Sequence, residues 1–231
     1  MSVASADLLS HVALFASLDA ESLRSVAQAA RVRAEPAGAL FFREGETASS
    51  FFVIQAGTVK LTQLTPEGHQ VVLRLISSGD AFGGAAAFGG GTYPVTAEAV
   101  TEATVYEWAG PVILRLMEKY PKLAINAARF VAAKLHELQV QYRQLATEKV
   151  ERRVARALIR LVQQAGKRVE SGVLIDLPLS REDIAQMTGT TLYTVSRIVS
   201  RWEAEGVLQA GRQRMIIKKP HSLLSVADDL A

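Results

Sequence analysis

The sequence predicts an α+β protein in which a small β-sandwich or barrel is followed by a long helix and then by two short helices. Three observations support this prediction. Residues 31–108 contain short β-branched or alternating runs that turn residues separate. Residues 121–145 carry apolar side chains at helical spacing, and residues 180–204 contain two helical runs on either side of Gly189.

Composition narrows the function classes. The 231-residue chain is 49% hydrophobic, which favours one or two buried cores over disorder. It contains no cysteine, which excludes disulfides, thiolate zinc sites and cysteine-held iron–sulfur clusters. No apolar run approaches the roughly 20 residues that cross a bilayer, and the first thirty residues lack the pattern of a signal peptide. We therefore expect a soluble cytoplasmic protein that does not contact a membrane.

Charge is distributed unevenly along the chain. Residues 1–146 hold 12 basic and 13 acidic side chains, whereas residues 147–231 hold 14 basic and 10 acidic ones. A basic C-terminal part favours an acidic partner for that part alone.

The first 110 residues predict short helices and then a β domain. Residues 7–30 have helical spacing that is interrupted near Ser17–Asp19, where Ser17 or Asp19 is expected to cap a new helix. Further along, Pro66 and Gly68 lie in the segment TPEGHQ between two strand-like runs, which is typical of a hairpin turn. Many short strands at this spacing predict a sandwich or barrel.

Residues 121–145 predict one long helix with an apolar seam. Pro121 fits a first-turn position, and 25 residues at 1.5 Å each span about 37 Å. The seam comprises Ala127, Val131, Leu135, Leu138, Tyr142 and Leu145, whose spacing approaches that of a coiled coil. The pattern alone suits a helix that lies on the β domain as well as a helix that pairs with a second copy.

A second helix is expected at 148–166, with Gly166 as its C-cap and a domain boundary near Thr147–Lys149. A short strand then follows in GVLIDLPLS. Ser180 is expected to cap the next helix, Gly189 to end it, and Thr190 or Thr191 to cap the last one. In that last helix the buried side is expected to be Val195, Ile198, Val199 and Trp202, and the opposite side Tyr193, Ser196, Arg197, Ser200 and Arg201.

Two helices joined by a glycine-containing turn form a helix-turn-helix, whose second helix lies in the DNA major groove. Arg197 can donate two hydrogen bonds to a guanine, while Ser196 and Tyr193 can reach bases or phosphates. An ordinary solvated face would carry similar residues, but the cap, the turn and the basic charge favour double-stranded DNA. The expected DNA-binding residues are Ser180, Thr190, Thr191, Tyr193, Thr194, Ser196, Arg197, Ser200 and Arg201.

The segment LSREDIAQMTGTTLYTVSRIVSRWEAEGVL resembles the winged helix-turn-helix of the Crp/Fnr family of transcription regulators. GETASSFFVIQAGTVKLTQLTPEGHQVVLRLISSGDAFGGAAAF resembles the family's β-roll, YPKLAINAARFVAAKLHELQV its dimerisation helix and GVLQAGRQRMIIKK its wing. The resemblance implies a jelly-roll-like β-roll sensor domain at 1–110, a dimerisation helix region at 111–147 and a winged helix-turn-helix domain at 148–231. It also implies a homodimer on two-fold symmetric DNA, with RNA polymerase as a partner if the protein is an activator.

The sequence departs from the family's cyclic AMP site. In the members that bind cyclic AMP, a glutamate holds the ribose and an arginine pairs with the phosphate. Gly84 stands here in the glutamate slot, and Tyr93 or Pro94 in the arginine slot, so cyclic AMP in the usual mode is not expected. The resemblance places the effector pocket at Gly83, Gly84, Ala85, Tyr93, Pro94, Val95, Leu138 and Gln139. Apolar Leu138 suggests a hydrophobic or gas-linked signal.

The recognition helix departs from the family as well, because Tyr193 replaces a glutamate that accepts from cytosine in many members. Ser196 and Arg197 match the family pattern. The resemblance therefore implies a half-site that is related to the family's half-site but different from it.

Other functions have less support. Haem would need ligands such as His11, His69, His136 or His221, which are scattered along the sequence. A metal-dependent barrel enzyme needs several converging histidines, yet residues 31–108 contain only His69. No serine, histidine and acid arrangement for a covalent hydrolase is visible, so no enzymatic activity is expected. A regulator of the same fold that needs no effector, and is controlled by its abundance, stays open.

Overall fold

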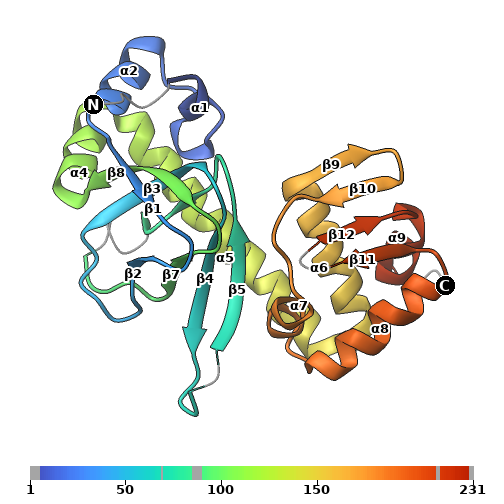
Figure 1. Ribbon diagram of the computed structural model, residues 1–231. Helices are drawn as coiled ribbons and strands as arrows, with labels where there is room; N and C mark the ends of the chain where they lie inside the picture. The colour runs from blue at the N-terminus through green and yellow to red at the C-terminus, as the bar shows by residue number, and fades with distance from the viewer. Residues whose placement is uncertain (1–5, 69, 85–89, 212–213, 229–231) are drawn as a thin grey trace. The chain divides into compact units, whose positions relative to one another are not determined.

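The computed structural model describes residues 6–68, 70–84, 90–211 and 214–228. The chain divides into two compact units, one made of residues 1–63 and 75–138 and the other of residues 64–74 and 139–231. Figure 1 shows the helices and strands of both. The predicted α+β class is confirmed, with β-sheets in the N-terminal half and a helix-turn-helix near the C-terminus.

Short helices begin the first unit: α1 (Ala6–Ser10), the 3-10 helix η1 (Ala13–Phe15) and α2 (Ala20–Gln28). The Asp19 carboxylate accepts a hydrogen bond from the Ser22 backbone N–H at 2.8 Å and caps α2, as the sequence predicts. This hydrogen bond lowers the pKa of the Asp19 carboxyl because it stabilises the charged form.

Two four-stranded sheets form the predicted β domain (Figure 1). In the first sheet the order is β1 (Arg31–Glu35), β8 (Ala103–Ala109), β3 (Ser50–Ala56) and β6 (Ala81–Phe82), and each neighbouring pair is antiparallel. In the second sheet the order is β2 (Leu40–Phe42), β7 (Thr96–Ala99), β4 (Val59–Leu64) and β5 (Gln70–Ile76). One hydrophobic cluster contains residues from both sheets and fills the interior of the domain.

A second cluster joins the first sheet to the helices. It includes Trp108 of β8, whose indole N–H donates to the Val26 carbonyl of α2 at 2.9 Å. Helix α4 (Gly110–Lys119) and the start of α5 (Pro121–Thr147) complete this cluster. The two helices are separate because the ring of Pro121 disfavours helical backbone at the preceding residue, Tyr120, where α4 ends. The long helix was predicted to begin at Pro121, as observed, but α4 was not predicted as a separate helix.

The first turns of α5 are buried in this unit. Asn126 donates its side-chain N–H groups to the carbonyls of Leu14 and Ala16, at 3.2 and 2.7 Å. Ala127 is only 7% exposed and belongs to the same core cluster. Its methyl group therefore packs inside its own chain, which sets it apart from the exposed residues of the predicted seam.

The second unit holds the helix-turn-helix. Its helices are α6 (Val150–Ala165), α7 (Arg181–Thr188), α8 (Leu192–Ala204) and α9 (Pro220–Asp228). A four-stranded sheet has the order β11 (Leu208–Gly211), β12 (Arg214–Ile217), β10 (Gly172–Ile175) and β9 (Gly166–Val169). The sequence analysis predicted β10 but not β9. Gly166 follows α6 as predicted, yet its φ of −76° is not left-handed. A Cβ there would lie 2.3 Å from the Val162 carbonyl oxygen, so close approach requires glycine.

Candidate nucleic-acid interface

The caps of the helix-turn-helix follow the predictions. The Ser180 hydroxyl accepts from the Asp183 backbone N–H at 3.0 Å, and the Asp183 carboxylate accepts from the Ser180 N–H, which forms a capping box on α7. Gly189 ends α7 with a left-handed φ of 60°. Thr191 then caps α8, since its hydroxyl accepts from the Thr194 N–H at 3.2 Å. The Ser180 and Thr191 hydroxyls, both expected to bind DNA, are thus already engaged at helix N-termini.

Helix α8 has the buried and exposed sides that its sequence predicts. The predicted core residues Val195, Ile198, Val199 and Trp202 are all buried. On the other side Tyr193 is 77% exposed, Arg197 and Ser200 are exposed, and Ser196 is half-buried. The exposed side chains recur at helical spacing, so they form a single face. Thr190 and Thr194 are half-buried beside the N-terminus of α8.

Arg201 has a different setting from Arg197. Its guanidinium pairs with the Glu151 carboxylate in the first turn of α6, and Glu205 lies 4.0 Å away. A nucleic-acid phosphate would have to displace these carboxylates to contact Arg201. The pair joins residues that are 50 positions apart, so the sequence offered no sign of it.

A groove of about 420 Å³ lies beside the face of α8. It is lined by Val150, Glu151, Thr194, Arg197, Ile198 and Arg201. Arg197 supplies a planar donor group that suits a phosphate or the acceptor edge of a base, whereas the Arg201 guanidinium is paired with Glu151 in the same groove. The groove and the exposed side of α8 therefore form a continuous surface that can bind an anionic polymer.

The sequence analysis missed Leu192, the first residue of α8. Its side chain is 47% exposed and neighbours Tyr193, so the N-terminal turn presents two large apolar surfaces. Apolar side chains at this position of a recognition helix can contact thymine methyl groups. The signal was present in the sequence, because Leu192 falls four residues before Ser196 on the same face.

The remaining seam residues on α5 are exposed in the single chain. Val131 is 45% exposed, Leu135 and Leu138 are each 57%, Tyr142 is 76% and Leu145 is 50%. A row of exposed large apolar side chains on one helix marks a contact surface. The pairing of this surface with a second copy stays a prediction.

The expected effector region is dominated by aromatic packing. Tyr93 is 3% exposed, and its ring stacks on Phe42 with the centroids 3.7 Å apart. Its hydroxyl donates to the Ser50 carbonyl and accepts from the backbone N–H of Ser49 and Ser50. In the same cluster the rings of Phe41 and Phe42 each contact Phe52 and Phe82, and Phe52 stacks on Phe82. Tyr93 is thus a core residue with a satisfied hydroxyl.

Other effector-pocket residues have varied surroundings. Pro94 is exposed and its carbonyl accepts from the Gln63 side chain, whereas Val95 packs against the interior cluster. Gly83 has a φ of 75°, and a Cβ there would lie 2.8 Å from the Ser50 carbonyl oxygen. Ala85 lies outside the described residues, Gly84 is buried, and Leu138 and Gln139 are exposed on α5. A groove of about 560 Å³ elsewhere in the first unit involves other residues, among them His11, Arg129 and Lys134.

Within the described ranges, no three histidine, aspartate or glutamate side chains gather in a way that could hold a metal ion. His11, His136 and His221 are exposed, and His69 lies outside the described residues. None of the helices in the described part of the chain combines the length and hydropathy needed to cross a membrane.

Comparisons with known proteins match two parts of the chain to two different domain families. Residues 32–120 match the family model of the cyclic nucleotide-binding domain, and residues 152–226 match that of the Crp-like helix-turn-helix domain. The cyclic AMP receptor protein of Thermus thermophilus is 27% identical over 199 residues, covering 86% of this chain and 89% of that protein. The nitrogen fixation regulation protein FixK of Azorhizobium caulinodans is 28% identical over 188 residues, covering 81% and 75%.

Solved structures show the same fold. FixK2 from Bradyrhizobium japonicum matches with a TM-score of 0.77 at 22% identity, covering 85% of this chain and 96% of that one. TTHB099, a transcriptional regulator from Thermus thermophilus, matches with a TM-score of 0.72 at 25% identity, covering 85% and 96%.

Proposed function

Because this chain belongs to the Crp/Fnr family of transcription regulators, we propose that it acts as a homodimer that binds a palindromic DNA site. The observation that carries the proposal is the exposed face of α8, with Tyr193, Arg197 and Ser200 directed away from its buried side. A Crp-like helix-turn-helix binds DNA, and its second helix enters the major groove.

In this proposal Arg197 reads a guanine with two hydrogen bonds, and Tyr193 determines the base that differs from the family's half-site. The exposed side chains of α5 from Val131 to Leu145 pair with their two-fold mates. The two copies of α8 then enter successive major grooves about 34 Å apart, so half-sites lie one helical turn apart.

The effector, where one exists, is not cyclic AMP in the usual mode. The match to a cyclic nucleotide-binding domain concerns the fold, whereas Gly84 offers no side chain to a ribose. Tyr93 directs its hydroxyl to the Ser50 backbone instead of offering a positive charge to a phosphate. Gly83, which lies beside Phe52, and Val95, which packs against the hydrophobic interior of the β domain, stay candidates for contact with another ligand, and that interior suits an apolar or gas-linked signal.

A second candidate is a regulator that needs no effector, so that its abundance sets the occupancy of its sites. The stacked Phe42 and Tyr93 rings and the neighbouring phenylalanines favour it, because they fill the interior of the β domain with the chain's own side chains. Under either candidate, RNA polymerase is a partner only if the protein activates transcription.

An unbiased selection from a random double-stranded DNA library tests the proposal, with purified protein and no added ligand. An inverted repeat is expected, and a parallel selection with Arg197→Ala should lose the guanine at one position of each half-site. Enrichment only in the presence of cell extract would support an effector-dependent regulator. If no sequence were enriched under either condition, the proposed function would be wrong.

A further inference from the structure

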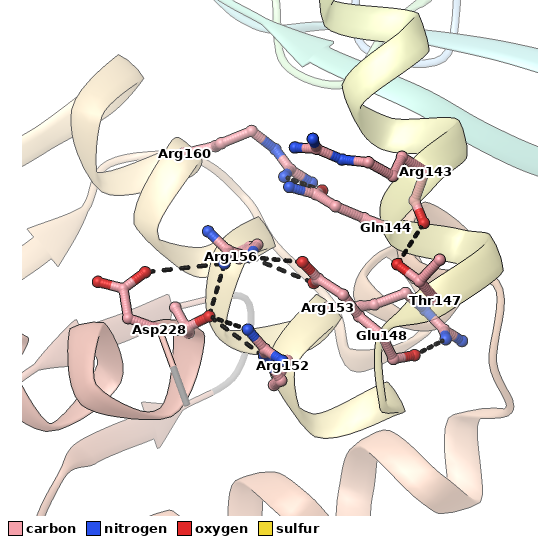
Figure 2. A network of polar contacts seen from close by, with 10 residues as sticks. Arg143, Gln144, Thr147, Glu148, Arg152, Arg153, Arg156, Arg160 and Asp228 are labelled. Carbon is pink, nitrogen blue, oxygen red and sulfur yellow. Dashed lines mark hydrogen bonds and ion pairs between the residues drawn. The ribbon is translucent and has the colours of Figure 1, made fainter. Parts of the chain in front are cut away.

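Three arginines along α6 reach back to the end of α5. Arg153, Arg156 and Arg160 are spaced by three and four residues, so they share one face of the helix. Arg156 Nε donates to both carboxylate oxygens of Glu148, at 3.1 and 3.2 Å, and Arg160 Nη1 donates to Gln144 Oε1 at 3.2 Å. Figure 2 shows these side chains bridging the two helices where the chain bends at Glu148.

Arg153 makes contacts in two directions. Its Nη1 donates to the Glu148 carbonyl at 2.8 Å, at the end of α5 (Figure 2). Its Nε donates to the Thr188 carbonyl at 2.9 Å and its Nη2 to the Gly189 carbonyl at 3.3 Å. Thr188 is the last residue of α7, where carbonyls lack intrahelical partners and favour a cation. One guanidinium therefore joins the bend after α5 to the turn of the helix-turn-helix.

The end of α5 also contacts that turn through a side chain. A Cβ placed on Gly189 would lie 3.0 Å from Leu145 Cδ2, so Leu145 packs against the turn. Residues 139–147 of α5 belong to the same compact unit as the helix-turn-helix. Tyr142 and Leu145, which are exposed and lie in the proposed seam, are thus part of the same unit as α8.

We infer that Arg153 is a positioning residue that fixes the angle between the end of α5 and the recognition helix α8. The inference rests on the proposed function, because it concerns a dimer bound to two half-sites. Tyr142 and Leu145 contact the second copy in the proposed dimer. Arg153 fixes the orientation of α8 relative to this contact through its hydrogen bonds to the carbonyls of Glu148, Thr188 and Gly189. The dimer should then accept only a narrow range of half-site spacings. Lysine cannot replace this function, since one ammonium group lacks the planar fork that spans the three carbonyls.

The spacing preference provides the test. One base pair inserted between the half-sites shifts them by about 3.4 Å and rotates them by roughly 35°. We expect the wild-type protein to bind its selected repeat at least about tenfold more tightly than repeats with one base pair added or removed. Arg153→Lys and Arg153→Gln should lose about tenfold on the selected spacing, as expected when charge-assisted hydrogen bonds are lost. Their affinity for the altered spacings should change little, so discrimination between spacings disappears.

A matched control removes the same charge elsewhere. Arg168 is an exposed arginine of β9, and Arg168→Gln should keep the full spacing preference. Arg160→Gln removes the contact with Gln144 but leaves Arg153 and its three carbonyl partners in place, so it should reduce discrimination in the same direction but by less. This variant also provides a measurement if the Arg153 variants do not fold, as thermal melting would reveal.

Two results would overturn the inference. The Arg153 variants could lose affinity by one common factor at every spacing, which would indicate a structural or purely electrostatic role. Alternatively, Arg153→Lys and Arg160→Gln could keep the wild-type spacing profile. Both results leave the proposed function intact, because that function fails only if the wild-type protein selects no inverted repeat.

Discussion

Replacing Leu135 by glutamate should dissociate the proposed dimer. Leu135 is 57% exposed near the middle of the apolar row on α5. Complete burial of a leucine contributes roughly 1.5–3 kcal/mol, so covering its exposed part contributes about 0.9–1.7 kcal/mol per protomer. Because a two-fold interface contains two copies, losing both leucines weakens the dimer by about 1.7–3.4 kcal/mol, or roughly 20- to 300-fold. A glutamate adds the free-energy cost of desolvating two carboxylates.

The assay is the molar mass by light scattering over a dilution series. The wild-type protein should show twice the chain mass of 25.0 kDa, and Leu135→Glu should show the chain mass itself at concentrations where the wild type is dimeric. Leu114→Glu is the control, since Leu114 is 41% exposed on α4 and lies outside the row. If Leu135→Glu kept the wild-type mass throughout the series, the assignment of this row as the dimer interface would be refuted.

A substitution at Ala127 should affect the core of the first unit, whereas one at Leu135 should affect the dimer interface. Ala127 is 7% exposed and belongs to the core cluster, although it shares the spacing of the row. Ala127→Glu should therefore lower the melting temperature sharply, because a carboxylate would enter an apolar core. Leu135→Glu should instead give a folded monomer with a circular dichroism spectrum close to that of the wild type.

Three further predictions concern the bound DNA and the effector. Arg197→Ala should cost about 1–3 kcal/mol on the selected site and relax specificity at one base pair, whereas Arg201→Ala should cost less because Glu151 already pairs with Arg201. Competition binding measures both, and an equal loss on every DNA sequence would make Arg197 a phosphate contact. Leu192 should contact a thymine methyl, so replacing that thymine by uracil in both half-sites should weaken wild-type binding about tenfold, at about 0.8 kcal/mol per methyl. Leu192→Ala should be insensitive to the same replacement, and full sensitivity in that variant would contradict the contact. Cyclic AMP should change neither DNA affinity nor melting temperature, and a clear shift in either would show that Gly84 and Tyr93 do not prevent its binding.

The elements that the sequence predicted well are those determined by local interactions. Ser180, Gly189 and Thr191 act on backbone groups within a few residues, so their residue types were enough to locate α7 and α8. The buried side of α8 was predicted from the spacing of its apolar residues, because Val195 and Trp202 are seven positions apart and therefore lie on the same side of a helix. The β domain was predicted as a class, but its strand order could not be derived from the sequence, and neither could β9 in the second unit.

The features that the sequence did not predict depend on contacts between residues that are far apart in the chain. The hydroxyl of Tyr93 binds the backbone of Ser50, 43 residues earlier, and Arg201 pairs with Glu151, 50 residues earlier. Neither partner has a local signature, so Tyr93 was predicted to be a pocket residue and Arg201 a DNA-binding residue on the same face as Arg197. Ala127 has the same spacing as the other seam residues, and only its packing against the first unit separates it from them.

These long-range contacts together favour the regulator that needs no effector. Stacked on Phe42 and hydrogen-bonded to Ser50, Tyr93 occupies the interior of the β domain where the resemblance placed a ligand. Arg153 and Leu145 join the end of α5 to the turn before α8 within a single compact unit. A ligand shifts an equilibrium only through a difference in its affinity for two states. If Arg153 and Leu145 hold one arrangement of α5 and α8, the DNA selection without added ligand should succeed, and the protein's abundance should then determine its occupancy on DNA.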